Sequence, residues 1–124
     1  MNQVLTFVIV TGAWFLIEAV IGFFLGTKKP YNVVLLVIHG ILTVFVIAGV
    51  ISSIYGLAAV TFGKTGSEIS LHAASLALLV IIISGIRLSV SKKDSPGLVL
   101  VHKLSAFVLA ISLITGIIFI IVKI

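Results

Sequence analysis

The C-terminal stretch SPGLVLVHKLSAFVLAISLITGIIFIIV, residues 95–122, is an apolar run long enough to cross a membrane, with one histidine inside it. Ser95 is a candidate N-cap, and Pro96 stands in the first turn, where proline is tolerated. A helix that begins there places His102 seven residues past its cap. The stretch therefore predicts a membrane helix that carries an ionisable side chain within its span.

An earlier stretch has the same design. Asn32 is a candidate cap, apolar residues follow it, and His39 again lies seven residues past the cap. With a rise of about 1.5 Å per residue, His39 and His102 each lie about 10 Å inside their helices. These histidines are 63 positions apart, as are Gly22 and Gly85, so the chain is a candidate internal repeat of two helices.

The composition indicates an integral membrane domain. Of 124 residues, 61% are hydrophobic and only 9% are charged, which is too apolar for a soluble domain. We expect one all-α domain over residues 1–124, a four-helix up-down-up-down bundle with spans at about 4–25, 32–57, 69–90 and 96–122. The first span is too long for a signal peptide, so we expect it in the mature protein. The absence of cysteine excludes disulfides, iron–sulfur clusters and covalent haem attachment.

Basic residues at the ends of the spans explain the net charge of +5, so membrane lipid and not nucleic acid is the expected partner. Most of them fall at one face: Lys28, Lys29, Arg87, Lys92, Lys93 and Lys103. Lys64 and Lys123 fall at the other. This asymmetry predicts two short cytoplasmic loops and outside termini in a prokaryotic-type plasma membrane. A longer polar loop is expected over residues 63–68, with Ser67 or Ser70 as the cap of the third helix.

The pair His39 and His102 is the first candidate for chemistry. Ionisable groups inside a bilayer are costly and usually face the interior of a bundle. The second and fourth helices run the same way, so the two imidazoles are expected to face each other at one depth. Such a pair suits the iron of one haem b, with both histidines as metal ligands. The alternative is that each histidine merely hydrogen-bonds a neighbouring helix.

Four further residues are candidates for contact with this cofactor. Gly40 and Ala106 are small residues near the ligands that would let a flat ring approach the backbone. Arg87 and Lys103 are basic residues at the same face, where haem propionates would find charge-assisted hydrogen bonds.

His72 and Glu18 leave more alternatives open. His72 begins the third helix at the opposite face, so it cannot join the pair. It is a candidate ligand of a second haem, a candidate hydrogen-bonding group for a quinone, or an interfacial histidine without a function. Glu18 lies near the depth of the histidine pair, where a carboxylate needs protonation or a partner. The two candidate partners are the free ring nitrogen of a ligand histidine and Arg87. Glu18 is then part of a proton route to a quinone, or simply a neutral, hydrogen-bonded acid.

The second to fourth spans resemble the membrane b-type cytochromes, which include cytochrome b561 and the cytochrome b subunits of hydrogenases. The resemblance rests on His39-Gly40, on Leu71-His72 leading to Ser84-Gly85-Ile86-Arg87, and on the segment from Val101 to Ala106. It implies haem b held between helices by histidine pairs, and one-electron transfer between a quinone or a redox partner protein and another acceptor. A two-haem member needs a fourth ligand, and this chain has three histidines.

Two other functions stay open. The segment from Leu16 to Gly22 is similar to the first span of the small multidrug resistance exporters, in which a membrane glutamate exchanges protons with cationic drugs. Glu18 would then be the functional residue. The third reading is an accessory subunit of a larger membrane complex, or a homo-oligomer, in which the histidines only join helices. If the chain is part of an enzyme, an electron-transfer oxidoreductase is expected.

Overall fold

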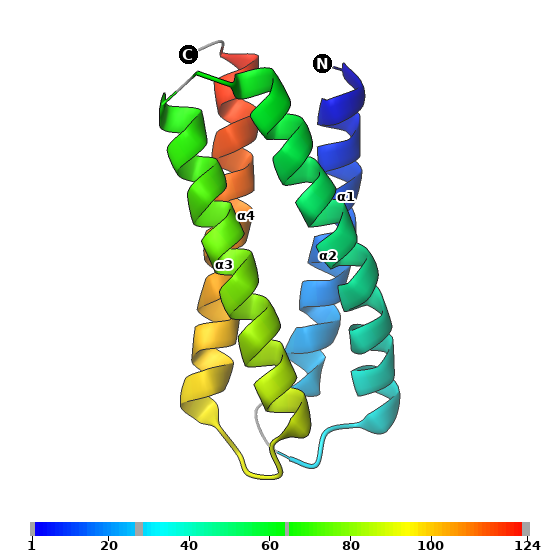
Figure 1. Cartoon of the computed structure of the whole chain (residues 1–124). Coiled ribbons are helices and arrows are strands. Elements are labelled where there is room, and N and C mark those ends of the chain that lie inside the picture. The colour runs from blue at the N-terminus through cyan, green and yellow to red at the C-terminus, as the bar shows by residue number, and fades with distance from the viewer. Residues whose placement is uncertain (1, 27–28, 64, 123–124) are drawn as a thin grey trace.

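The computed structural model describes residues 2–26, 29–63 and 65–122, and four long helices make up nearly all of this part of the chain. They are α1 (Asn2–Leu25), α2 (Val33–Thr61), α3 (Thr65–Val90) and α4 (Pro96–Ile121), which run up and down in turn (Figure 1). Each helix is long and apolar enough to cross a membrane. The predicted all-α four-helix bundle is therefore confirmed, and its spans are those of a multi-pass membrane protein.

The turn between α2 and α3 is shorter than the sequence suggested. The chain stays helical to Thr61, and α3 begins at Thr65, so most of the expected polar loop over residues 63–68 is helix. The predicted caps Ser67 and Ser70 are wrong, because both side chains are buried within α3. The turn is made by Gly63, whose φ of 82° lies in the left-handed region that glycine reaches without strain. The polar residues from Thr65 onward belong to α3.

The helix starts that place the two histidines are as predicted. Asn32 caps α2, because its side chain accepts a hydrogen bond from the Leu35 backbone N–H at 3.1 Å. Ser95 occupies the N-cap position of α4 but its side chain makes no capping bond, and Pro96 is the first helical residue. The seven-residue interval from cap to histidine therefore holds in both helices.

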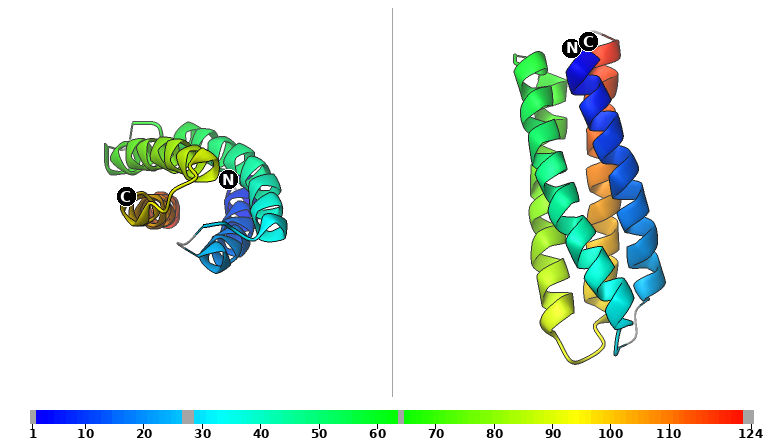
Figure 2. Two further views of the ribbon diagram at one scale, coloured as in Figure 1. Left: turned by 90° about the horizontal axis from the view of Figure 1, so that it is seen from below. Right: turned by 90° about the vertical axis from the view of Figure 1, so that its right-hand side faces the viewer.

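The four helices form two hairpins. α1 packs closely on α2 and α3 packs closely on α4, whereas the hairpins meet mainly where α2 touches α3 and α4. α1 and α4 have little contact, so the helices follow an open arc when the bundle is viewed along its axis (Figure 2, left). The up-down-up-down bundle is thus open along the edge between α1 and α4.

The apolar core that joins the hairpins lies towards the end of the bundle that holds the termini. Leu57 and Val50 of α2 are completely buried there. The first half of α2, from Val33 to Phe45, contributes no buried side chain. Inter-hairpin packing is therefore concentrated in one half of the molecule. In the other half, close to the connections 26–32 and 91–95, the hairpins stand further apart, and the candidate site lies between them.

Candidate functional site

A cavity of about 340 Å³ lies between the two hairpins, and all four helices line it. Its volume falls in the range of about 300–1,000 Å³ that is usual for ligand sites. The lining is mostly apolar, with Phe15, Phe23 and Phe107 among its members. His39 from α2 and His102 from α4 both line this cavity. The two residues that the sequence pairs by depth are thus brought to one site from different hairpins.

His39 lies against the backbone of α1. A Cβ atom at Gly22 would stand only 2.9 Å from His39 Cε1, so glycine is what leaves room for the ring. The ring nitrogen Nδ1 is buried and has no hydrogen-bond partner within residues 2–26, 29–63 and 65–122. It lies 3.7 Å from Glu18 Oε1. A buried polar atom without a partner is unusual in a folded protein, and the Glu18 carboxyl group lies just beyond hydrogen-bond distance of this one.

His102 lies in the same way against α3. A Cβ atom at Gly85 would stand 3.1 Å from His102 Cε1. Ser84 Oγ donates to the Val80 carbonyl at 2.6 Å and lies 2.8 Å from His102 Nδ1. Because a hydroxyl has only one proton, a Ser84 that donates to Val80 accepts the Nδ1–H of His102. The His102 tautomer with a free Nε2 lone pair is the one that this contact favours.

The two hairpins therefore repeat one contact. Gly22 and Gly85 are 63 positions apart, as are His39 and His102, and each glycine meets the histidine of its own hairpin. The repeat noted in the sequence is thus also present in the structure, because each hairpin has the same contact between a glycine and a histidine. The polar neighbours differ, since a carboxylate stands beside His39 and a hydroxyl beside His102.

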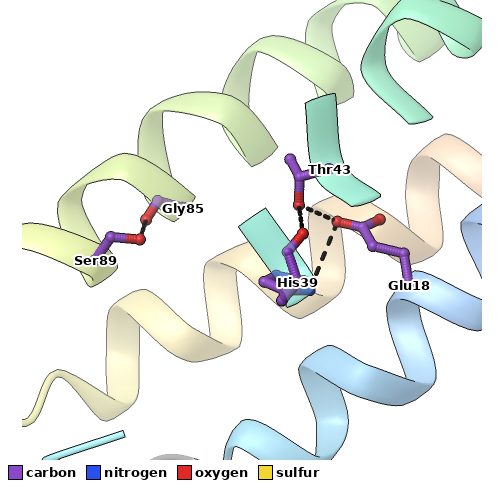
Figure 3. A network of polar contacts seen from close by, with 5 residues as sticks. All are labelled: Glu18, His39, Thr43, Gly85 and Ser89. Carbon is purple, nitrogen blue, oxygen red and sulfur yellow. Dashed lines mark hydrogen bonds and ion pairs between the residues drawn. The ribbon is translucent and has the colours of Figure 1, made fainter. Parts of the chain in front are cut away.

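Glu18 is buried between α1 and α2, with 8% of its surface exposed. Thr43 Oγ1 lies 2.5 Å from Glu18 Oε1 and 2.7 Å from the His39 backbone carbonyl, and its single proton is donated to one of these two oxygens (Figure 3). Of the two partners expected for Glu18, the ring nitrogen of His39 is therefore the neighbour. Glu18 lines the cavity as well, so its carboxyl group and the two imidazoles share one space.

Lys103 and Ala106, which were predicted near the cofactor, also line the cavity. Lys103 Nζ lies 5.2 Å from the centre of the Phe23 ring, a cation–π contact that reaches from α4 to α1 across the open edge. The cavity thus has a positive charge at its rim.

Three other predicted residues lie outside this group. Gly40 and Arg87 are exposed and are not part of the cavity lining. A Cβ atom at Gly40 would meet no neighbour within 4 Å, so its small size is not used for close packing. His72 is exposed in the first half of α3, and its Nδ1 lies 2.7 Å from the Glu68 carbonyl of the same helix. It is remote from the cavity.

Sequence reasoning did not assign a role to Ser84, Thr43 or the two glycines. The equal spacing of the glycines and histidines was the available signal for the glycines, because a repeat that preserves both must also preserve their contact. Ser84 and Thr43 gave no such signal, since hydroxyl residues are common in membrane helices and usually bond to their own backbone.

No cluster of three or more His, Cys, Asp or Glu side chains that could hold a metal ion is present among the described residues. A haem carries its own ring nitrogens and takes only axial ligands from the protein, so a histidine pair suffices for it. No protein-family model, no curated protein and no solved structure matches this chain. Its function must therefore be argued from the cavity itself.

Proposed function

We propose that this protein is a membrane haem b protein that transfers single electrons, in which His39 and His102 would bind the haem iron. The observation that carries the proposal is the convergence of these two residues on one apolar cavity from separate hairpins. A histidine with a purely structural role would use both ring nitrogens in hydrogen bonds to neighbouring helices. His39 Nδ1 is buried without a hydrogen-bond partner in the described part of the chain, whereas His102 Nδ1 is paired with Ser84 of α3.

The residues around the cavity fit this cofactor. The glycines beside each ring leave space for the imidazoles, and the apolar walls keep out water. Histidines that bind a metal usually donate their other ring N–H to a nearby acceptor, and Ser84 accepts that bond from His102. Glu18 stands close to the corresponding nitrogen of His39. Lys103 supplies positive charge at the rim for the carboxylate groups of a haem.

When bound, a haem supplies reversible one-electron chemistry at its iron. The chain would contribute the ligand nitrogens, orient His102 through Ser84, and place the Glu18 carboxyl group beside His39. The donor and the acceptor would be a quinone or a redox partner protein, and the weak contact between α1 and α4 offers access from the lipid side. Action within a larger complex or a homo-oligomer is compatible with this arrangement.

We also propose the plasma membrane as the location, with the connections 26–32 and 91–95 in the cytoplasm. The described basic residues gather at that end of the bundle: Lys29, Arg87, Lys92, Lys93 and Lys103. Cytoplasmic loops carry such an excess in multi-pass proteins. The predicted contributions of Lys28, Lys64 and Lys123 fall outside the described residues.

A second candidate is proton-coupled export of a cationic drug. The observation that favours it is the position of Glu18, which lines the same cavity. A buried acid that binds protons and cations in turn would use this space for its substrate. Glu18→Gln would then abolish transport, whereas in the haem reading the cofactor stays bound and only its spectrum and potential change.

The deciding experiment is a reduced-minus-oxidised visible spectrum, with a pyridine haemochrome count, of protein produced with ample haem precursor. Low-spin b-type bands at one haem per chain are expected for the natural sequence. His39→Ala and His102→Ala should each lose these bands, and His72→Ala, the matched control, should keep them. A colourless natural protein, or full retention of haem in both of the first two variants, would refute the proposal.

A further inference from the structure

Lys29 joins the two hairpins at the end of the bundle where they have no common core. Its backbone N–H donates to Asp94 Oδ1 at 2.7 Å, which ties the connection 26–32 to the connection 91–95. Its Nζ donates to the backbone carbonyls of Leu88 and Ser91, at the C-terminal end of α3. One residue of the first hairpin therefore makes three hydrogen bonds to the second.

The partners of Lys29 are groups that need a donor. The last carbonyls of a helix have no partner within the helix, and the C-terminus of a helix carries partial negative charge. An ammonium group has three N–H donors and a positive charge, so it satisfies both needs. Usually a lysine of the same helix does this. Here the lysine comes from the other hairpin, so the capping bond is also a link between the hairpins.

The position of this link gives it a consequence for the site. The core holds the hairpins together in the half that contains the termini, and the cavity separates them in the other half. The Lys29–Asp94 bond joins the two connections, which lie at the same end of the bundle (Figure 2). Tyr31, Leu36 and Ser89 line both the cavity and a polar pocket beside Lys29, so the link adjoins the site.

We propose that Lys29 is a positioning residue that fixes the spacing of the two hairpins at the loop end, and through it the separation of His39 and His102. The proposed role of Lys29 in setting the spacing of the hairpins rests on the contacts described above and on nothing else. Its effect on cofactor binding rests on the proposed function. Loss of the link lets the hairpins part about the core as a hinge, and both histidines, about 10 Å from the loop end, move with them.

The first test measures the spacing without any haem. The chain has no cysteine, so spin labels can be placed at single introduced cysteines. Phe24→Cys on α1 with Leu100→Cys on α4 reports on the loop end, and both sites are exposed and outside the cavity lining. Ile9→Cys with Ile114→Cys, also exposed and on the same two helices, reports on the end that holds the core.

In haem-free protein in lipid nanodiscs, Lys29→Met should lengthen and broaden the electron–electron distance of the loop-end pair and leave the core-end pair unchanged. Lys29→Arg should restore the natural distribution, because it keeps charge and donors. The matched control is Lys93→Met, which removes the same charge from the same face. The Lys93 ammonium has no ion-pair partner in the described part of the chain. Asp94→Ala, which removes only the bond to the Lys29 backbone, serves if Lys29→Met does not fold.

The second test titrates haem into the same variants. Lys29→Met should weaken haem binding about tenfold, since hydrogen bonds of a charged group are lost. Lys93→Met should not. An unchanged loop-end distance in both Lys29→Met and Asp94→Ala would overturn the positioning role, whatever haem does. A longer distance in a protein that never binds haem would uphold the role of Lys29 and reject the proposed function.

Discussion

At the scale of single residues, the two glycines beside the imidazoles are positions where an added methyl group would meet a site residue. Gly22→Ala would place a Cβ atom 2.9 Å from His39 Cε1, so either the ring or α1 must shift. We expect a loss of about 1–3 kcal/mol in the free energy of unfolding, as for an overpacked core, together with weaker haem binding. Denaturation by sodium dodecyl sulfate and haem titration measure the two effects.

The control for this substitution lies in the same helix. Gly12→Ala introduces a Cβ atom that meets no neighbour within 4 Å, so stability and haem binding should both be retained. Gly85→Ala should behave like Gly22→Ala with a smaller effect, because its Cβ atom would stand 3.1 Å from His102 Cε1. Equal behaviour of Gly12→Ala and Gly22→Ala would show that His39 does not need the space.

Tyr31, which lies in the connection before α2, gives the protein a pH dependence outside the membrane. Burial, and after it the Asp94 carboxylate, raises the pKa of Tyr31 above its ordinary value of 10.0. The neutral phenol is therefore favoured in the folded state. Its contribution to stability is complete below the unfolded pKa and is lost as the pH rises through the folded pKa. Tyr31→Phe should remove this loss of stability at alkaline pH.

Tyrosinate absorbance in a Tyr55→Phe background isolates the titration of Tyr31, because the chain has two tyrosines. Asp94→Ala should lower the pKa of Tyr31 towards the ordinary value without reaching it, since the effect of burial stays. A titration that does not respond to Asp94→Ala would contradict the contact between the two connections.

At the scale of helices, the two caps provide a matched pair. Asn32 makes a side-chain bond to the start of α2, and Ser95 makes none to α4. Asn32→Ala should therefore lower the free energy of unfolding by about 0.5–2 kcal/mol. Ser95→Ala should change stability by no more than about 0.5 kcal/mol. Unfolding in detergent compares the two variants, and equal losses would show that the Asn32 bond does not contribute.

The sequence predicted the helices well because apolar runs of membrane length leave few alternatives. Their ends were predicted where a local signal exists, as at the Asn32 cap of α2. The start of α3 was missed because serine and glycine are typical of loops as well as of close helix contacts. Gly66, for example, is helical and packs against the Phe119 ring.

At the scale of the whole molecule, one half is packed by the apolar core and the other half holds the cavity. This division predicts where shortening a side chain lowers the free energy of unfolding. Leu57 is completely buried at the junction of the hairpins, whereas Leu76 of α3 is 65% exposed. Leu57→Ala should lower the free energy of unfolding by about 2–5 kcal/mol. Leu76→Ala, with the same chemical change, should stay within about 0.5 kcal/mol. Similar losses in detergent unfolding would mean that the core does not hold the hairpins together.

The equal depth of His39 and His102 could be predicted because it depends only on two caps and the rise of a helix. The open edge between α1 and α4 could not, since it depends on how α2 leans towards α4, and nearly every face of these helices is apolar. The role of Lys29 was also hidden, because its partners are backbone carbonyls, which no side-chain pattern reveals.

The repeated contact between glycine and histidine has a consequence for membrane topology. A hairpin of two spans returns to the face from which it started, so a second copy joined to it enters the bilayer the same way up. The histidine of the second copy then arrives at the level of the first. A unit with an odd number of spans would enter inverted and would leave one histidine near each face. Because the repeated unit crosses the membrane an even number of times, the histidines of its two copies lie at the same depth and can act as a pair.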